Sequence, residues 1–291
     1  MSLQATQRRH TWSKFLSGTF ACMCLLATLS CIAALVLLLW QVFSHGMDWL
    51  TWDFIRALPS RFPAKAGIRT ALAGSLWLMG LTTIISVPIG VGAAIYLEEY
   101  ATANRLRTLV QTNIANLAGV PSIVYGILGL GLFVRFMALE RSILAGALTL
   151  SLVVLPIIVL ASQEALRAVP PSIRNASFAL GATKWQTIWH QVLPASVPGI
   201  MTGVILAMAR ALGEAAPLLA IGAVAYVPFV PSNLSDEFTA LPIQIFNWSA
   251  RPQEDFHSVA AAGIIVLLAV LICLNAIAVF VRYRASKRIR W

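Results

Sequence analysis

Charge is scarce in this sequence. Only 11% of its 291 residues are charged and 59% are hydrophobic, whereas a soluble domain is about 25% charged and about 45–50% apolar. So few polar side chains cannot cover the surface of a water-soluble protein. The net charge of +10 does not indicate nucleic-acid binding, because the basic residues stand in short segments beside long apolar runs. The composition predicts a helical membrane protein.

Motifs for catalysis, metal binding and nucleotide binding are also absent. The chain has no GxxxxGK[ST] phosphate loop, and its four histidines form no HExxH or Ser/His/Asp arrangement. The four cysteines lie in apolar runs without CxxC spacing, which indicates hydrophobic packing. We therefore expect no catalytic residue, no metal and no cofactor, and any ATP hydrolysis must come from a partner.

Six apolar segments are long enough to cross a membrane, because a hydrocarbon core about 30 Å thick needs about 20 helical residues. The predicted spans are residues 18–43, 72–97, 114–137, 143–161, 198–221 and 259–280. The short break from Arg135 to Arg141 requires a tight outside turn, or else a broken or re-entrant segment. The predicted fold is an all-α polytopic membrane protein.

The distribution of charge predicts the orientation. The first apolar run is too long for the core of a cleaved signal peptide, so we expect a retained signal anchor. Six spans place both termini on one side. If that side is the cytoplasm, inside segments hold 13 of the 21 Lys and Arg residues and outside segments hold 7, in agreement with the positive-inside rule. Both termini are therefore expected to be cytoplasmic.

Two outer loops carry further signals. Lys65 and Arg69 lie in a first outer loop that is unusually basic. Either strong flanking spans carried this loop across, or these two cations form an anion-attracting mouth. The second loop, residues 222–258, predicts a short interfacial helix near Phe246 and Trp248. That loop is either an interfacial cap or a contact surface for another protein.

The longest inside loop, residues 162–197, predicts a helix–turn–helix. The apolar positions after Gly181 follow the spacing of one helix face, and they are Trp185, Ile188, Trp189, Val192 and Leu193. Gly181 suits the turn, and residues 175–180 form the shorter first helix. Such a motif either lies on the membrane surface or docks in a groove of a partner, and periodicity alone does not choose.

The fifth span contains a charged pair, Arg210 and Glu214. Their four-residue spacing places both side chains on one helix face. Arg210 lies about 18 Å beyond Pro198 along the helix, where an isolated charge costs about 2.5–3.5 kcal/mol. Two roles remain open. In the first, the two residues form an intrahelical ion pair that faces the bundle. In the second, Arg210 contacts a transported oxyanion, because a guanidinium binds such anions well, and Glu214 limits the strength of that binding.

The stretch "NASFALGATKWQTIWHQVLP" resembles the cytoplasmic signature of ABC-importer permeases. In that family this loop forms the coupling helices that insert into the ATPase subunits, so the resemblance favours docking. Asn175 stands where the family usually has glutamate and Gln191 where it usually has isoleucine, so the polar contact with the ATPase is expected to differ. The residues that the resemblance assigns to the ATPase contact are Asn175, Ala176, Ser177, Gly181, Trp185, Leu193 and Pro194.

Three more stretches, "ARALGEAAPLL", "GAAIYLEEY" and "NIANLAGVPSIVYGILGL", resemble the phosphate-specific permeases of the PstA type. Ala215 replaces a threonine that is usual there. The sister PstC type is the nearest alternative, and the first and third stretches favour PstA. The resemblance covers about residues 66–284. The implied divisions are a cytoplasmic tail (1–17), a first span with its outer loop (18–65), a permease domain (66–284) containing the coupling loop, and a basic cytoplasmic tail (285–291).

The resemblance implies an inner-membrane permease of the type I fold that imports inorganic phosphate. The implied partners are a PstC-like permease in a heterodimer, two copies of a PstB-like ATPase and a periplasmic PstS-like phosphate-binding protein. The residues expected along the substrate pathway are Arg210, Glu214, Ser122 and Tyr125. The residues alone leave open another oxyanion such as sulfate, and disfavour an ion-coupled secondary transporter, because no internal repeat and only one charged pair occur in the spans.

Overall fold

The structure is a computed structural model that describes residues 3–102, 104–223 and 226–286. Five of its helices are long and apolar enough to span a membrane, and the number is six if a bent pair of helices is counted as one span. The helices are α1 (Leu3–Gly46), α2 (Trp52–Arg56), α3 (Arg69–Ile95), α4 (Arg105–Ala118), α5 (Ser122–Gly129), α6 (Ile143–Arg167), α7 (Pro171–Ala179), α8 (Lys184–Thr187), α9 (Leu193–Gly213), α10 (Ala216–Ala220), α11 (Leu241–Ser249) and α12 (Glu254–Ser286). The described residues form no β-strand, so the predicted all-α class is confirmed. Of the predicted tails, residues 1–2 and 287–291 lie outside the described part of the chain.

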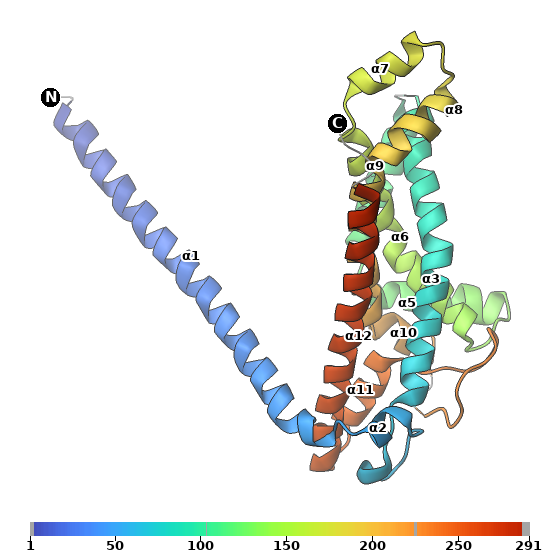
Figure 1. The fold of residues 1–291 in the computed structure, drawn as a ribbon. Coiled ribbons are helices and arrows are strands. Elements are labelled where there is room, and N and C mark those ends of the chain that lie inside the picture. The colour runs from blue at the N-terminus through green and yellow to red at the C-terminus, as the bar shows by residue number, and fades with distance from the viewer. Residues whose placement is uncertain (1–2, 103, 224–225, 287–291) are drawn as a thin grey trace.

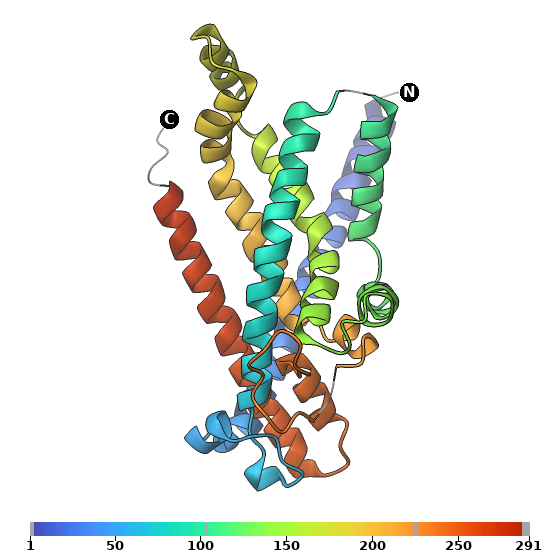
Figure 2. The same cartoon turned by 90° about the vertical axis from the view of Figure 1, so that its right-hand side faces the viewer.

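The centre of the bundle is formed by α3, α6 and α9, which run side by side (Figures 1 and 2). Small residues allow this close approach. A Cβ atom at Gly90 of α3 would lie 2.7 Å from Ile158, and one at Gly199 of α9 would lie 2.7 Å from Ala165. Because lipid offers no hydrophobic drive between helices, such packing of small residues holds a membrane bundle together.

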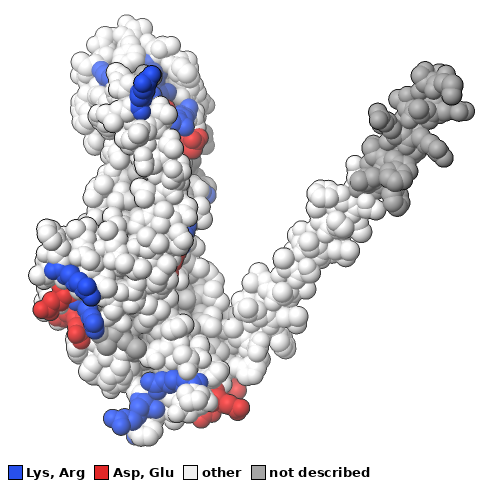
Figure 3. Space-filling model, turned by 180° about the vertical axis from the view of Figure 1, so that it is seen from behind, with Lys and Arg blue, Asp and Glu red and all other residues white. Residues whose placement is uncertain are grey.

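On one face of the molecule, charged side chains gather in certain regions (Figure 3). Figure 3 shows charged side chains at the two ends of the bundle and on a lobe at its side, with a mostly uncharged surface between them. A bilayer core excludes unpaired charge. On this face, the uncharged surface is therefore the part that a bilayer core would surround.

The first span stands apart from the other helices. Helix α1 leaves the bundle at a wide angle (Figure 1), and none of its most apolar window is buried. It packs at its C-terminal end, where Gly46 approaches the backbone of Ala261 and Ala262 and Val42 contacts Ile265. The predicted span 18–43 lies within α1.

The third predicted span, residues 114–137, is a bent pair of helices in the structure. Helices α4 and α5 meet at 103°, and Figure 2 shows α5 end-on, across the direction of the bundle. Pro121 causes the break, because it lacks an N–H group and disfavours helix at the residue before it. The expected break near Arg135 to Arg141 is present, because the helical segment ends at Phe136 and α6 begins at Ile143, and a second break lies at residues 119–121.

The predicted boundaries of the fifth span are also wrong. The helix is continuous from Lys184 to Gly213, so residues 184–193 are the inner end of the span and not a separate surface helix. A π-helical segment, Ile188–Val192, joins α8 to α9. The helix ends at Gly213 and the short α10 follows, since Pro217 has no N–H to donate to the carbonyl of Gly213.

The long outer loop folds back into the bundle. Its helix α11 confirms the predicted short helix, and Leu241 donates its backbone N–H to Ser75 Oγ of α3 at 2.8 Å. Phe246 is exposed as expected. Trp248, however, is 0% exposed and packs against Phe54 with ring centroids 5.9 Å apart, because α11 turns this side chain into the core. Its prediction as an interfacial residue is wrong.

We expect Gly203→Leu to destabilise the bundle, because a Cβ atom there would collide with Ala161 of α6. Overpacking of this kind costs about 1–3 kcal/mol. Thermal unfolding of the purified chain in detergent measures the effect. Gly92→Leu is the matched control, since a Cβ atom at Gly92 meets nothing within 4 Å. An equal melting temperature for the two variants would contradict the close α6–α9 packing.

Candidate functional site

A charged pair closes the outer end of α9. The backbone of Glu214 is extended, with φ −81° and ψ 112°, so the helix stops before it. Its carboxylate folds back, and Arg210 Nε donates to Oε1 at 3.2 Å. The predicted pair therefore forms, although Glu214 caps the helix end instead of lying within the helix.

The register of α9 against α6 gives the depth of this pair. Gly199 of α9 packs against Ala165 of α6, and Gly203 packs against Ala161. The two helices are therefore antiparallel, and the same register places Arg210 level with Val154. Val154 lies about 16 Å from the first residue of α6 and about 20 Å from the last. Arg210 is therefore near the middle of the membrane.

The pair is not enclosed by this chain. The Arg210 side chain is 46% exposed and that of Glu214 is 18% exposed. Arg210 shares this exposed face of α9 with Thr202 and Leu206. A charge at this depth cannot be left against hydrocarbon without a large cost, so protein or water from outside the chain must cover the face.

Helix α5 brings Tyr125 close to the pair. Gly126, the residue after Tyr125, packs closely against α10, since a Cβ atom at Gly126 would lie 2.7 Å from Pro217. Pro217 follows Glu214 by three residues. Tyr125 is buried and within electrostatic range of Arg210. Its hydroxyl donates to the carbonyl of Leu117 at 2.7 Å, which satisfies a backbone group at the end of α4. Tyr125 thus braces the break between α4 and α5 beside the charged pair.

The other predicted pathway residues are more distant or less engaged. Ser122 is half-buried at the start of α5, and within the described residues its hydroxyl makes no hydrogen bond to Arg210 or Glu214. Lys65 and Arg69 are exposed at the outer end of α3. Gly90 of α3 packs against Ile158 of α6. In this register, the part of α3 that is level with Arg210 lies about 25 Å along the helix from Arg69. The structure does not bring these two cations into the site.

The inside loop forms a knob that projects beyond the bundle (Figure 1). Gly181 takes the left-handed backbone conformation, φ +82°, that the sharp turn between α7 and α8 requires. Thr183 and Gln186 then form a capping box that starts the long helix. Ser177 and Thr187 pair through their hydroxyls at 2.8 Å, which holds α7 against that helix.

Several large apolar side chains are exposed on this knob. Trp185 is 59% exposed and stacks on Trp189 with ring centroids 5.6 Å apart. Leu180 and Phe178 of the α7 segment are exposed as well. The predicted single apolar face is divided, because Ile188 and Val192 are buried against the bundle while the two tryptophans are not. Exposed apolar patches of this kind mark interaction sites.

Sequence reasoning missed the anchor of α7. Glu99 Oε1 accepts from Arg174 Nη2 at 2.7 Å, and the same guanidinium donates to the carbonyls of Leu166 and Val169. Both charged side chains are mostly buried. The pair joins residues 75 positions apart, so no local spacing could have revealed it. It fixes α7 to the inner ends of α3 and α6.

The outer loop is ordered against the start of α6. An isolated β-bridge joins Ser142 to Glu237. Backbone N–H groups of Ser232 and Asn233 donate to the Asp236 carboxylate at 2.8 and 2.9 Å, and these bonds hold the pKa of Asp236 below its usual value. The loop therefore presents a defined outer surface.

Among the described residues no cluster of three or more His, Cys, Asp or Glu side chains could hold a metal. The chemistry of Arg210 suits an anion, and the exposed apolar side chains of the knob suit a protein contact. The helical bundle with its projecting helix–turn–helix has the fold of the class of permease subunits of ABC importers. Two solved structures share the fold. A bacterial alginate ABC transporter matches with TM-score 0.59 at 15% identity over 84% of this chain and 86% of its own. The MetNI methionine ABC transporter in an inward-facing conformation matches with TM-score 0.56 at 19% identity over 84% and 98%.

The chain belongs to the family of binding-protein-dependent transport system inner membrane components, whose model matches residues 86–291. One relative, the phosphate transport system permease protein PstA 1 of Mycobacterium tuberculosis, is 35% identical over 88% of this chain and 84% of its own. Another, the probable ABC transporter permease YqgI of Bacillus subtilis, is 33% identical over 84% and 89%. The PstA protein of Haemophilus influenzae is 34% identical over 79% and 86%. The chain is therefore a multi-pass, non-catalytic permease subunit that works with an ATPase and a substrate-binding protein.

We expect Arg174→Gln to release α7 from the bundle, because it leaves the mostly buried Glu99 carboxylate without its partner. Hydrogen exchange of the backbone amides of residues 170–183 should become at least about tenfold faster. This change corresponds to a free energy of local opening that is lower by about 1.4 kcal/mol. The double variant Arg174→Glu with Glu99→Arg should recover part of the protection. Unchanged exchange in Arg174→Gln would show that the ion pair does not anchor α7.

Proposed function

We propose that this chain is a PstA-like permease subunit of an ATP-driven importer of inorganic phosphate. The single observation that carries the proposal is the pair of Arg210 and Glu214, a cation near mid-depth on a face of α9 that the chain itself leaves uncovered. A guanidinium offers planar donors to two phosphate oxygens and stays charged. The relatives named phosphate transport permeases support the choice of phosphate as cargo.

Glu214 gives the proposed site a means of release. Its carboxylate accepts one N–H group of Arg210, so an arriving anion meets a cation that is already partly neutralised. Phosphate would then bind through the remaining donors and leave as the pair closes again. Transport needs such moderate binding, because a site that binds too tightly does not release its cargo.

The exposed face of α9 supports a heterodimer with a PstC-like permease. Covering this face with a second permease would enclose Arg210 and Glu214 between two bundles and separate them from lipid. The ordered outer loop around Asp236 and α11 is the proposed contact for a periplasmic PstS-like phosphate-binding protein. The proposed location is the bacterial inner membrane, with both termini in the cytoplasm, as the distribution of basic residues predicts.

The knob is the proposed contact for a PstB-like ATPase, present in two copies in the transporter. Trp185, Trp189 and Leu180 form an exposed apolar surface, and a partner groove would bury it. The same helix runs from Lys184 to Gly213, so a displacement of the knob by the ATPase would be carried directly to Arg210.

A related oxyanion such as sulfate is the second candidate cargo, because the same guanidinium would bind it. An ion-coupled secondary transporter is disfavoured, since within the described spans Arg210 and Glu214 are the only ion pair near the middle of the membrane, and the family is one of binding-protein-dependent transport systems.

We expect Arg210→Gln to lower ATP-driven phosphate uptake by about 10–100-fold. The reason is that a hydrogen bond to a charged group, which contributes about 1.5–3 kcal/mol, is lost. Vesicles carrying the complete transporter and radiolabelled phosphate measure it. Arg210→Lys should be intermediate, because it keeps the charge and loses the planar donors. Arg61→Gln, at an exposed outer cation, is the control. Unchanged uptake in Arg210→Gln would remove this residue from the pathway, and equal inhibition by sulfate and unlabelled phosphate would favour the broader cargo.

We expect Trp185→Ala to weaken binding of the ATPase subunit by about 30-fold, the effect of removing an interfacial residue worth about 2 kcal/mol. Titration of the labelled ATPase against the reconstituted permease pair gives the dissociation constant. Trp52→Ala is the matched control, because Trp52 is similarly exposed at the opposite end of the bundle. If the two variants bind the ATPase equally, the knob is not its docking surface.

A further inference from the structure

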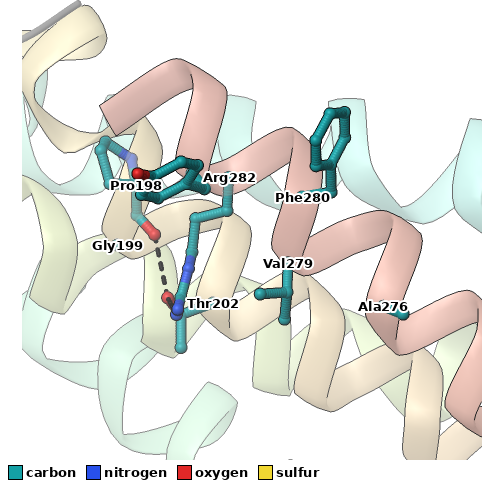
Figure 4. A pocket seen from close by; sticks show the side chains of 8 residues that line it. Pro198, Gly199, Thr202, Ala276, Val279, Phe280 and Arg282 are labelled. Carbon is teal, nitrogen blue, oxygen red and sulfur yellow. Dashed lines mark hydrogen bonds between the residues drawn. The ribbon is translucent and has the colours of Figure 1, made fainter. Parts of the chain in front are cut away.

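A second cation of interest lies in a cleft between α9 and α12. The cleft has a volume of about 740 Å³ and lies between Pro198, Gly199 and Thr202 of α9 and the last turns of α12. Figure 4 shows Arg282 reaching from α12 across to Thr202, while the ring of Phe280 points away from these two side chains. The cleft is separate from the pair formed by Arg210 and Glu214.

The Arg282 guanidinium is held in place without being neutralised. Its Nη1 donates to Thr202 Oγ1 at 3.0 Å, and that hydroxyl donates in turn to the carbonyl of Pro198 at 2.9 Å. This bond uses one of the five N–H donors of the guanidinium. None of the ion pairs in the described part of the chain involves Arg282. Its positive charge is therefore available to an anion in the cleft.

The cleft lies on the same face of α9 as Arg210. At about 100° per residue, Gly199, Thr202, Leu206 and Arg210 fall within an arc of about 80°, and all four are exposed. Thr202 lies about 12 Å from Arg210 toward the knob. The α6–α9 register places it level with Ser162, about 7 Å from the inner end of α6. Arg282 thus stands where the exposed face reaches the inner membrane boundary.

We infer that this cleft binds a phosphate group through Arg282, with Thr202 positioning the guanidinium. A planar guanidinium binds two phosphate oxygens at once, and the flanking aromatic Phe280 and Tyr283 suit the membrane boundary. The group has two sources. One is inorganic phosphate on its way from Arg210 to the cytoplasm, which rests on the proposed function. The other is the headgroup of an anionic lipid in the inner leaflet.

The two sources can be separated by the membrane in which the complete transporter is reconstituted. Vesicles of galactolipid contain no phosphate, whereas vesicles of galactolipid with phosphatidylglycerol do. The variant is Arg282→Gln and the matched control is Arg284→Gln, because Arg284 is two residues further on the same helix, packs over the ring of Phe280 and does not line the cleft. Thr202→Val is a second variant that keeps the side-chain shape and removes the hydroxyl.

We expect Arg282→Gln to lower phosphate uptake about tenfold relative to Arg284→Gln, with Thr202→Val between them. A loss in both kinds of vesicle identifies inorganic phosphate as the ligand. A loss only in vesicles with phosphatidylglycerol identifies the lipid headgroup, and native mass spectrometry should then show less phosphatidylglycerol retained by Arg282→Gln than by Arg284→Gln.

Equal uptake in both vesicles together with equal lipid retention for Arg282→Gln and Arg284→Gln would overturn the inference. Failure of the proposed function looks different, since the wild-type transporter would then hydrolyse ATP without taking up phosphate in either membrane. In that case the retention of phosphatidylglycerol alone decides whether the cleft binds a phosphate group.

Discussion

A guanidinium near the middle of a membrane must be paired and covered, and much of this structure follows from that constraint. Arg210 receives its partner because Pro217 ends the helix and lets Glu214 fold back onto it at 3.2 Å. Glycines let α9 lie close to α6, which holds Arg210 level with the centre of the bundle. The chain still leaves this face exposed, and a charge there is tolerated only if a second protein or water completes the enclosure.

The same helix connects this site to the inner knob. From Lys184 to Gly213 it has 30 residues, so Trp185 and Arg210 lie on one rod about 37 Å apart along its axis. The Arg174–Glu99 ion pair fixes α7 to the bundle beside it, and the capping box at Thr183 starts the rod cleanly. If the proposed function is correct, an ATPase that binds the knob and displaces it also moves the anion site, because one helix connects the two.

Much of the fold was predictable from the sequence, because long apolar runs in lipid have few alternatives to helices. The Arg210–Glu214 contact was predictable too, since it follows from four-residue spacing. The break at Pro121 and the continuity of residues 184–213 were not, because proline is accommodated within some membrane helices, such as α9 at Pro198, and breaks others. The burial of Trp248 and the Arg174–Glu99 pair depend on contacts between distant segments. The domain limits, the orientation and the roles of the pathway and coupling residues stay predictions.

The face of α9 that bears Arg210 should border an aqueous path, because a charge near the middle of the membrane needs protein or water around it. The direct measurement is labelling of Leu206→Cys by a membrane-impermeant thiol reagent in the assembled transporter, with the four native cysteines replaced and Leu37→Cys as the lipid-facing reference. Leu206 lies one turn from Arg210, and both leucines are similarly exposed. We expect fast labelling at position 206 that phosphate slows, and no labelling at position 37. Equal lack of labelling at both positions would contradict it.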